Sequence, residues 1–203
     1  SVKSYDSNMQ HHFDKKGELV CDKPFPSMPT GFWNDDNNDK FISAYFSHFD
    51  NVWRHGDYIM INSDGGVTIF GRSDATLNPG GVRIGTSEIY QIIEKHKKIQ
   101  DSVAVGKVVG GDEVIFLFLK LRGTEVLSDI LINEIKLLIR NNCSPRHVPE
   151  FILQVKDIPY TINGKKIEIA VKKVINQEEI TNLDSISNPD CLSEYLLKVN
   201  EVI

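Results

Sequence analysis

Residues 71–98 read GRSDATLNPGGVRIGTSEIYQIIEKHKK, and this stretch determines how the chain is organised. Its first half is polar and rich in glycine, asparagine and proline, a composition that favours an irregular loop. The isoleucines of its second half fall at helical spacing: Ile89, Ile92 and Ile93. Thr86 or Ser87 is the expected N-terminal cap, with Glu88 near the positive end of the helix dipole. The stretch therefore predicts a boundary near Asp74, followed by a helix of about three turns.

Downstream of this boundary, strand patterns alternate with helical patterns. The predicted strands cover residues 101–109, 114–121 and 151–155, and the predicted helices cover residues 128–141, 166–174 and 190–199. The first two strands are joined by a Gly-Gly-Asp turn, which predicts a hairpin. In the helix of residues 128–141 the expected inner face consists of Ile130, Leu131, Ile135, Leu138 and Ile139. This order of elements predicts an α+β domain over residues 74–203.

Upstream, residues 1–73 have the pattern of short strands joined by loops. We expect a strand over Glu18–Cys21 and irregular chain after it, because three prolines follow between residues 24 and 29. Residues 57–72, DYIMINSDGGVTIFGR, predict a tight hairpin around an Asp-Gly-Gly turn. The acidic run at residues 34–40 lacks the glycine and glutamate of an EF-hand loop and is interpreted as a solvated turn.

Composition excludes several classes of protein. The 203 residues carry a net charge of −5, which argues against nucleic acid as the principal partner. The apolar fraction is 40%, and no run approaches the ~20 apolar residues of a membrane span. Cys21, Cys143 and Cys191 lie far apart, which suits free thiols in the cytosol better than a disulfide frame or a zinc site. The opening lacks an apolar signal core, so we expect a cytosolic chain, and one cut from something longer.

Three motifs place charged side chains next to turns. In WRHGDY, residues 53–58, Asp57 follows a glycine at the expected start of a strand, where its carboxylate can accept hydrogen bonds from ribose hydroxyls. In residues 71–85, Arg72 and Arg83 flank the flexible loop, and arginine suits phosphate through its planar fork of donors. In PYTINGKK, residues 159–166, a constrained loop presents Lys165, a cation that can approach a carboxylate and a phosphate together.

These motifs, in this order and at these separations, resemble the C-terminal core motifs of the adenylate-forming enzymes, which include acyl-CoA synthetases, adenylation domains of peptide synthetases and luciferases. The surrounding sequence extends the resemblance over nearly the whole chain, in KPFPSMPTGFWND, AYFSHFDNVWRHGDY and IPYTINGKKIEIAVKK. The resemblance implies the β-rich end of a large AMP-binding domain over residues 1–73. It also implies a small mobile C-terminal domain over residues 74–203, built as a short antiparallel sheet with flanking helices.

The resemblance implies an acid–CoA ligase that uses ATP with Mg²⁺ and takes CoA as a substrate. Asp57 would hold the ribose hydroxyls, Arg72 would contact the nucleotide, and Arg83 would meet phosphate during adenylation. Lys165 would be the adenylation lysine. The phosphate loop, adenine pocket and acyl pocket of the family belong to a large N-terminal domain, the expected partner in the same enzyme. We therefore expect this chain alone to be inactive.

The same resemblance assigns a hinge and a CoA site, and no resident metal site. Asp74 would be the hinge about which the small domain swings between the two half-reactions. Gly80 and Gly81 would let the loop approach the pantetheine arm, because neither has a side chain. Arg140 would meet the nucleotide end of CoA, although a cation at a helix C-terminus also has a purely structural explanation.

Two other interpretations stay open at this point. One is a related ligase acting on acetate or another acid, because the acyl pocket lies outside these residues. The other is a non-catalytic interaction module that has kept the small-domain fold, since a fold does not by itself carry a function. For Lys165 and Lys166 the structural alternative is a solvated pair of lysines before a helix. His96 carries only a weak hint of a nearby cation.

Overall fold

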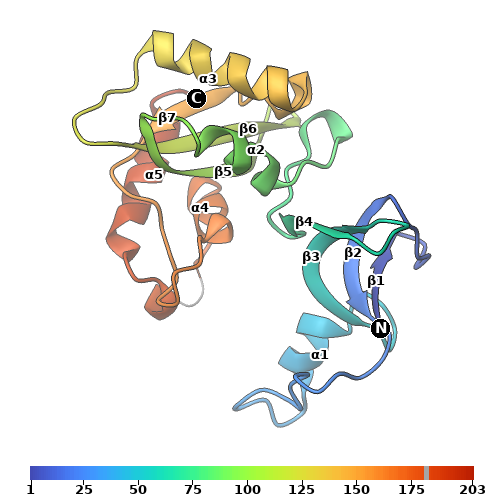
Figure 1. Cartoon of the computed structure of the whole chain (residues 1–203). Helices are drawn as coiled ribbons and strands as arrows, with labels where there is room; N and C mark the ends of the chain where they lie inside the picture. The colour runs from blue at the N-terminus through green and yellow to red at the C-terminus, as the bar shows by residue number, and fades with distance from the viewer. Residues whose placement is uncertain (181–182) are drawn as a thin grey trace. The chain divides into compact units, whose positions relative to one another are not determined.

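The computed structural model describes residues 1–180 and 183–203, and the chain divides into two compact units, Ser1–Asp74 and Ala75–Ile203. Each unit has its own sheet, as Figure 1 shows. No helix in the described ranges is both long enough and apolar enough to cross a membrane.

The first unit is a four-stranded antiparallel sheet in the order β1-β2-β3-β4. Its strands and its helix are β1 Val2–Tyr5, β2 Lys16–Cys21, β3 Trp53–Ile61, β4 Val67–Arg72 and α1 Asp39–Tyr45. Trp53 is 5% exposed and organises an aromatic cluster in which the Tyr45 ring stacks on it at 3.7 Å. Phe25 and Phe46 meet the same indole edge-on, so the proline-rich segment and α1 are both attached to β3 through this residue.

The second unit is a three-stranded sheet in the order β5-β6-β7, covered on both faces by helices. Its strands are β5 Ile99–Val109, β6 Asp112–Leu121 and β7 Phe151–Gln154, and its α-helices are α2 Thr86–Ile93, α3 Asp129–Asn142, α4 Glu168–Ile175 and α5 Leu192–Asn200. Short 3₁₀ turns cover Pro79–Gly81, Pro145–His147, Leu183–Ser185 and Pro189–Cys191. The predicted α+β fold, an antiparallel sheet with flanking helices, is confirmed, and β7 adds a parallel strand to it.

Strand β6 explains why two helical layers form. Successive side chains of a strand point to opposite faces of the sheet. Ile115, Leu117 and Leu119 pack with α2 and α3, whereas Phe116 and Phe118 pack with α4 and α5. All five side chains are at most 1% exposed, so an uninterrupted apolar run here buries both faces of the sheet.

Four local predictions were wrong in detail. Helix α1 occupies part of the region predicted as a solvated turn, because it begins at Asp39 and buries no residue that would reveal it in the sequence. Strand β3 begins at Trp53, so Asp57 lies within it. The cap of α2 is Gly85, whose N–H donates to the Glu88 carboxylate at 2.8 Å. Ile130 is 80% exposed, since it lies in the first turn of α3, outside the buried stripe of that helix.

Candidate functional site

Asp57, Arg72 and Asp74 come together at the end of the β3–β4 ladder. Asp57 and Arg72 are directly opposed across the two antiparallel strands. The Arg72 guanidinium donates to both carboxylate oxygens of Asp74, from Nε at 3.1 Å and from Nη2 at 2.8 Å. These hydrogen bonds raise the pKa of Arg72 above its ordinary value. Both side chains remain substantially exposed, at 50% and 39%, so this bidentate pair is open to an incoming anion.

Gly56 makes room for the Arg72 guanidinium. Its φ is 86°, and a Cβ atom at this position would lie 3.1 Å from Nη2 of Arg72. The carbonyl oxygen of Gly56 also accepts the Ser73 N–H at 2.9 Å, which extends pairing just beyond the end of β4. His55 lies beside the same position, with Nε2 at 3.3 Å from Oδ2 of Asp57. The glycine of the WRHGDY motif therefore leaves room for the Arg72 side chain, and the Asp57 side chain that follows it is 21% exposed.

A buried carboxylate supports this corner, and the sequence patterns did not single it out. Glu18 of β2 is 5% exposed and forms an ion pair with Nε of Arg54 at 3.2 Å. The Ser73 hydroxyl donates to Oε1 of Glu18 at 2.9 Å and accepts from Nη2 of Arg54 at 2.9 Å. This triad anchors the residue between Arg72 and Asp74 to two strands of the first unit. No spacing rule joins positions 18, 54 and 73, so only the folded sheet reveals them.

Gly80 and Gly81 lie in an exposed loop whose two ends are anchored. Leu77 and Ile84 exchange backbone hydrogen bonds at 2.9 and 2.8 Å, and both side chains are 1% exposed in the core of the second unit. Asp112, the first residue of β6, holds the tip of this loop, because its Oδ1 accepts a hydrogen bond from Gly80 N at 3.1 Å. Gly80 and Gly81 both have positive φ, 56° and 80°, which favours glycine at each.

Arg146 is a further basic residue at this loop that the motif analysis missed. A Cβ atom on Gly80 would overlap Nη1 of Arg146, so the guanidinium covers the open face of that glycine. Arg83, in the same loop, is exposed and has interactions of its own. Arg140 lies in the last turn of α3 and is exposed. Arg83, Arg140 and Arg146 are thus all exposed, and the guanidinium of Arg146 lies directly over Gly80.

Lys165 occupies a tight hairpin between β7 and α4. Thr161 N donates to the Lys165 carbonyl at 2.8 Å, and Lys165 N donates to the Thr161 hydroxyl at 3.0 Å. Gly164 has a φ of 74° and donates its N–H to the Thr161 carbonyl at 2.8 Å, which closes the turn. The Lys165 side chain is exposed, and its ammonium forms no ion pair within residues 1–180 and 183–203. The chain thus presents an exposed ammonium on a hydrogen-bonded turn.

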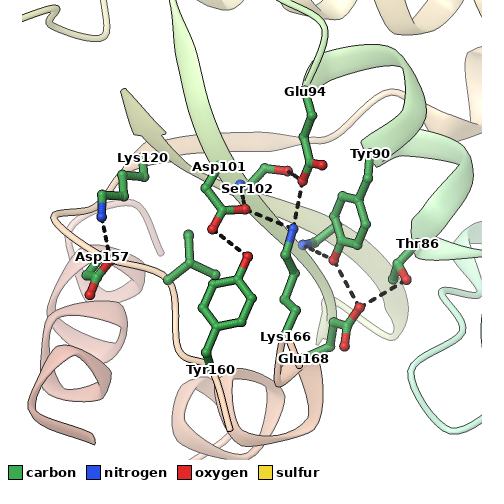
Figure 2. A network of polar contacts seen from close by, with 12 residues as sticks. Thr86, Tyr90, Glu94, Asp101, Ser102, Lys120, Asp157, Tyr160, Lys166 and Glu168 are labelled. Atoms are coloured by element: carbon green, nitrogen blue, oxygen red, sulfur yellow. Dashed lines mark hydrogen bonds and ion pairs between the residues drawn. The ribbon is translucent and has the colours of Figure 1, made fainter. Parts of the chain in front are cut away.

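Lys166 points the opposite way from its neighbour, so the two lysines are not a solvated pair. Its side chain is 15% exposed, and its ammonium lies 2.7 Å from Oε1 of Glu94 and 3.0 Å from Oδ1 of Asp101. It also lies over the ring of Tyr90, 4.1 Å from the centroid. Figure 2 shows Tyr90, Glu94 and Asp101 gathered around the Lys166 ammonium.

The predicted site residues therefore fall into separate groups. Asp57, Arg72 and Asp74 form one corner of the first unit, Gly80, Gly81 and Arg83 share one loop of the second, and Arg140 and Lys165 lie on other elements of that unit. Among the described residues no three His, Cys, Asp or Glu side chains lie together as metal ligands. The arrangement offers arginine forks for phosphate, a carboxylate beside one fork, and one unpaired ammonium.

Comparison with known proteins identifies close relatives. No protein-family model matches the chain. Acetoacetyl-CoA synthetase of Danio rerio is 49% identical over 197 residues, which are 96% of this chain and 29% of the relative. Acetoacetyl-coenzyme A synthetase of Rhizobium meliloti is 49% identical over 182 residues, 89% of this chain and 28% of the relative. The chain thus spans less than a third of the length of these relatives.

Solved structures match as well. Acetoacetyl-CoA synthetase from Streptomyces lividans superposes with a TM-score of 0.91 and 38% identity over 99% of this chain and 31% of that protein. A benzoate CoA ligase from Burkholderia xenovorans matches 85% of this chain and 33% of that protein with a TM-score of 0.70 and 24% identity, a level that demonstrates a shared fold alone.

Proposed function

Because this chain is homologous to the C-terminal part of the acetoacetyl-CoA synthetases, which are adenylate-forming enzymes, we propose that it is the C-terminal portion of an ATP-dependent acid–CoA ligase. The proposed acid is acetoacetate, supported by the names of the relatives that match nearly the whole chain. A ligase for acetate or another acid and a non-catalytic module are the alternatives that the experiments below separate from it.

The proposed reaction has two steps. A carboxylate oxygen of acetoacetate attacks the α-phosphorus of ATP, the bond to pyrophosphate breaks, and the acyl-adenylate forms. The CoA sulfur then attacks the acyl carbonyl, AMP leaves, and the thioester forms. Mg²⁺ enters with ATP, bound to its phosphates. The first step brings two anions together, so it requires positive charge where they meet.

The exposed ammonium of Lys165 is the observation that carries the proposal. It extends from a hairpin closed by three short hydrogen bonds, so its backbone is preorganised while its side chain can reach outward. In the proposal this cation contacts the carboxylate and the α-phosphate during adenylation. A single preorganised donor of this kind contributes about 10²- to 10³-fold to the rate. Once the adenylate exists, this cation has no further task.

The residues of the first unit are proposed to hold the nucleotide. The Asp57 carboxylate accepts hydrogen bonds from the ribose hydroxyls, and Arg72 contacts the nucleotide from the opposing strand position. Arg83 of the second unit meets phosphate during adenylation. The exposed fork of Arg72 supports this role, because a guanidinium that already binds a carboxylate in bidentate fashion has the geometry that phosphate also needs.

The remaining residues are proposed to serve the second step. Asp74 is the hinge about which the small domain swings, so that CoA approaches the same carbonyl that Lys165 faced before. Gly80 and Gly81 admit the pantetheine arm, and Arg140 meets the nucleotide end of CoA. Positive φ and exposure at both glycines support this role, since a side chain there would narrow the approach.

The test is Lys165→Ala in the longer enzyme of which we propose this chain to be the C-terminal portion. Adenylate formation, measured as pyrophosphate release from acetoacetate and ATP, should fall about 10²- to 10³-fold. Conversion of supplied acetoacetyl-adenylate and CoA to the thioester should persist. The matched control is Lys97→Ala, another exposed lysine of the second unit, which should change neither step. An equal fall in both steps would refute the role of Lys165.

Two further measurements test the proposal. Pyrophosphate release by residues 1–203 alone would contradict the expectation that the large N-terminal domain is required. A panel of acids offered to the longer enzyme separates acetoacetate from acetate and other substrates, and inactivity with every acid would favour the non-catalytic module. We propose that the enzyme is cytosolic, which its three free cysteines support. We also propose that it acts in lipid and fatty acid metabolism.

A further inference from the structure

Both stems of the Lys165 hairpin are held by one carboxylate. Tyr160 and Lys166 form a β-bridge that closes the turn of residues 161–165. The Tyr160 hydroxyl donates to Oδ2 of Asp101 at 2.7 Å, and the Lys166 ammonium lies 3.0 Å from Oδ1 of the same residue. Figure 2 shows the Tyr160 and Lys166 side chains next to each other, both reaching Asp101.

Asp101 is itself fixed by its strand. It belongs to β5, at the point where the register with β6 shifts between Ile99 and Asp101. Its side chain is 17% exposed, and Oδ1 accepts the N–H of Ser102 at 2.8 Å. The following residues of β5 enter the buried core of the unit. The carboxylate is therefore part of the rigid sheet, whereas the hairpin it holds lies outside the sheet.

The ammonium of Lys166 is held on three sides. Besides Asp101, it contacts Glu94 at 2.7 Å and the ring of Tyr90 at 4.1 Å. Glu94 is in turn oriented by the Ser102 hydroxyl, which donates to Oε1 at 2.9 Å. A largely buried ammonium is costly unless it is paired in this way, so the hairpin cannot shift without separating charges.

We call the two contacts of Asp101, with Tyr160 and with Lys166, the Asp101 clamp, and Tyr160 is its neutral arm. Burial and the hydrogen bond to Asp101 raise the pKa of Tyr160 above its ordinary value, so the hydroxyl keeps its proton. Asp101 therefore binds one cationic and one neutral donor with its two oxygens. This differs from an isolated surface ion pair, because both contacts are short and both donors belong to one hairpin.

We propose that Asp101 is a positioning residue for Lys165: its two carboxylate oxygens tie both stems of the hairpin to strand β5 and so fix where the catalytic ammonium emerges. This inference rests on the proposed function for the role of Lys165. Its structural basis is the position of Lys165, one residue from Lys166 and five from Tyr160, inside a turn that both anchors close. A displacement of about 1 Å at a reacting group can cost on the order of 10²-fold in rate.

The experiment is Asp101→Asn in the longer enzyme that contains this chain. We expect kcat for adenylate formation to fall about ten- to a hundredfold. The KM for ATP and the rate of thioester formation from supplied acetoacetyl-adenylate should stay within about twofold, because the hydrogen-bond and ion-pair partners given for Asp101 are Ser102, Tyr160 and Lys166. Glu134→Gln is the matched control, since it removes the α3 carboxylate that lies 3.1 Å from Nε2 of His96, and it should change neither step.

A double-mutant cycle tests the clamp itself. Tyr160→Phe removes one arm and Lys166→Met removes the other, so each should slow adenylation by less than Asp101→Asn. In the Asp101→Asn background, the further loss on Tyr160→Phe should be smaller than in the parent, because the acceptor has already been changed. Amide hydrogen exchange of residues 161–165 should accelerate in Asp101→Asn and stay unchanged in Glu134→Gln.

The outcomes separate the two levels of inference. If Asp101→Asn slows both half-reactions equally, or leaves exchange of residues 161–165 unchanged, the positioning role is overturned. If Lys165→Ala leaves adenylation intact while exchange responds to Asp101→Asn, the proposed function fails but the clamp stands. If the Asp101→Asn variant does not fold, the same two half-reactions and the exchange of residues 161–165 are measured in Tyr160→Phe, which removes a single hydroxyl.

Discussion

Gly56 and Gly65 have nearly the same backbone angle, with φ of 86° and 89°, but very different surroundings. A Cβ on Gly56 meets the Arg72 guanidinium, whereas a Cβ on Gly65 meets nothing within 4 Å. We predict that alanine at either position destabilises the fold by about 1–2 kcal/mol through its positive φ. Only Gly56→Ala should also raise the KM for ATP, by about tenfold, because it displaces Arg72. Urea unfolding and steady-state kinetics of the two variants check this, and an equal KM in both would contradict it.

Gly80 and Gly81 form a second such pair. Alanine at Gly80 would overlap the Arg146 guanidinium, whereas alanine at Gly81 would enter open space. Both variants should lose affinity for CoA under the proposed function. Gly80→Ala should lose more, and Arg146→Ala should remove most of that difference, because the displaced side chain is then absent. The measurement is the KM for CoA of Gly80→Ala and Gly81→Ala, each with and without Arg146→Ala, and a difference that survives Arg146→Ala would show that Arg146 is not its cause.

The residues of the candidate site differ in how far sequence could predict them. Lys165 could be singled out because its turn is encoded locally, by a threonine, a glycine and the lysine itself within five positions. Asp101 could not, because it lies 59 positions from Tyr160 in the chain and only the packing of β5 against the hairpin joins them. The same applies to Glu18, which meets Ser73 across 55 positions.

Among the elements, α3 shows how a local signal and tertiary packing combine. Its N-cap is Ser128, whose hydroxyl accepts the Leu131 N–H at 3.3 Å. We predict that Ser128→Ala lowers the free energy of unfolding by about 1 kcal/mol, because a backbone donor loses its partner. Ser128→Asp, which retains a capping oxygen, should leave stability unchanged. Urea denaturation followed by circular dichroism is the measurement, and equal stability of the alanine and parent chains would rule out this cap contribution.

Element length decided which elements could be predicted. Strands β5 and β6 were predicted because eleven and ten residues give a long apolar pattern, and both faces of that pattern are buried. Helix α1 was missed because its seven residues bury nothing and its aromatic side chains serve the Trp53 cluster instead. Ile130 was misplaced because spacing alone does not show where the packed part of a helix begins.

For the whole molecule, three tyrosines with raised pKa contribute to the response to alkaline pH. Burial, the largest cause in each case, raises the pKa of Tyr90, Tyr160 and Tyr195 above the ordinary value of about 10. Above that pH the unfolded chain releases these protons while the folded chain keeps them, so folded stability falls as pH rises. Below it, these groups contribute no pH dependence.

We predict that the free energy of unfolding declines above about pH 9, where the cysteines, whose pKa values burial raises, begin to ionise in the unfolded chain. The decline should steepen above about pH 10, with each fully shifted tyrosine contributing up to about 1.4 kcal/mol per pH unit. Tyr195→Phe should lower stability at pH 8, because the Tyr195 hydroxyl donates to the Asp157 carbonyl at 2.8 Å. The same substitution should also make the free energy of unfolding fall less steeply above about pH 10, because one titrating tyrosine is absent. Urea titrations between pH 8 and 11 measure both effects, and an unchanged slope would mean that Tyr195 ionises in the folded state.

The opposite orientation of Lys165 and Lys166 has a consequence for chain length. Neighbouring residues of an extended segment face opposite sides, so adding or removing one residue within positions 162–164 would shift both lysines by one place relative to Tyr160. An insertion would put Lys165 in the inward place and the residue before it in the outward place, whereas a deletion would put Lys166 in the outward place and Ile167 in the inward place. A single-codon insertion or deletion would therefore remove one of the two ammonium groups from its place, whereas a substitution in this turn alters one side chain.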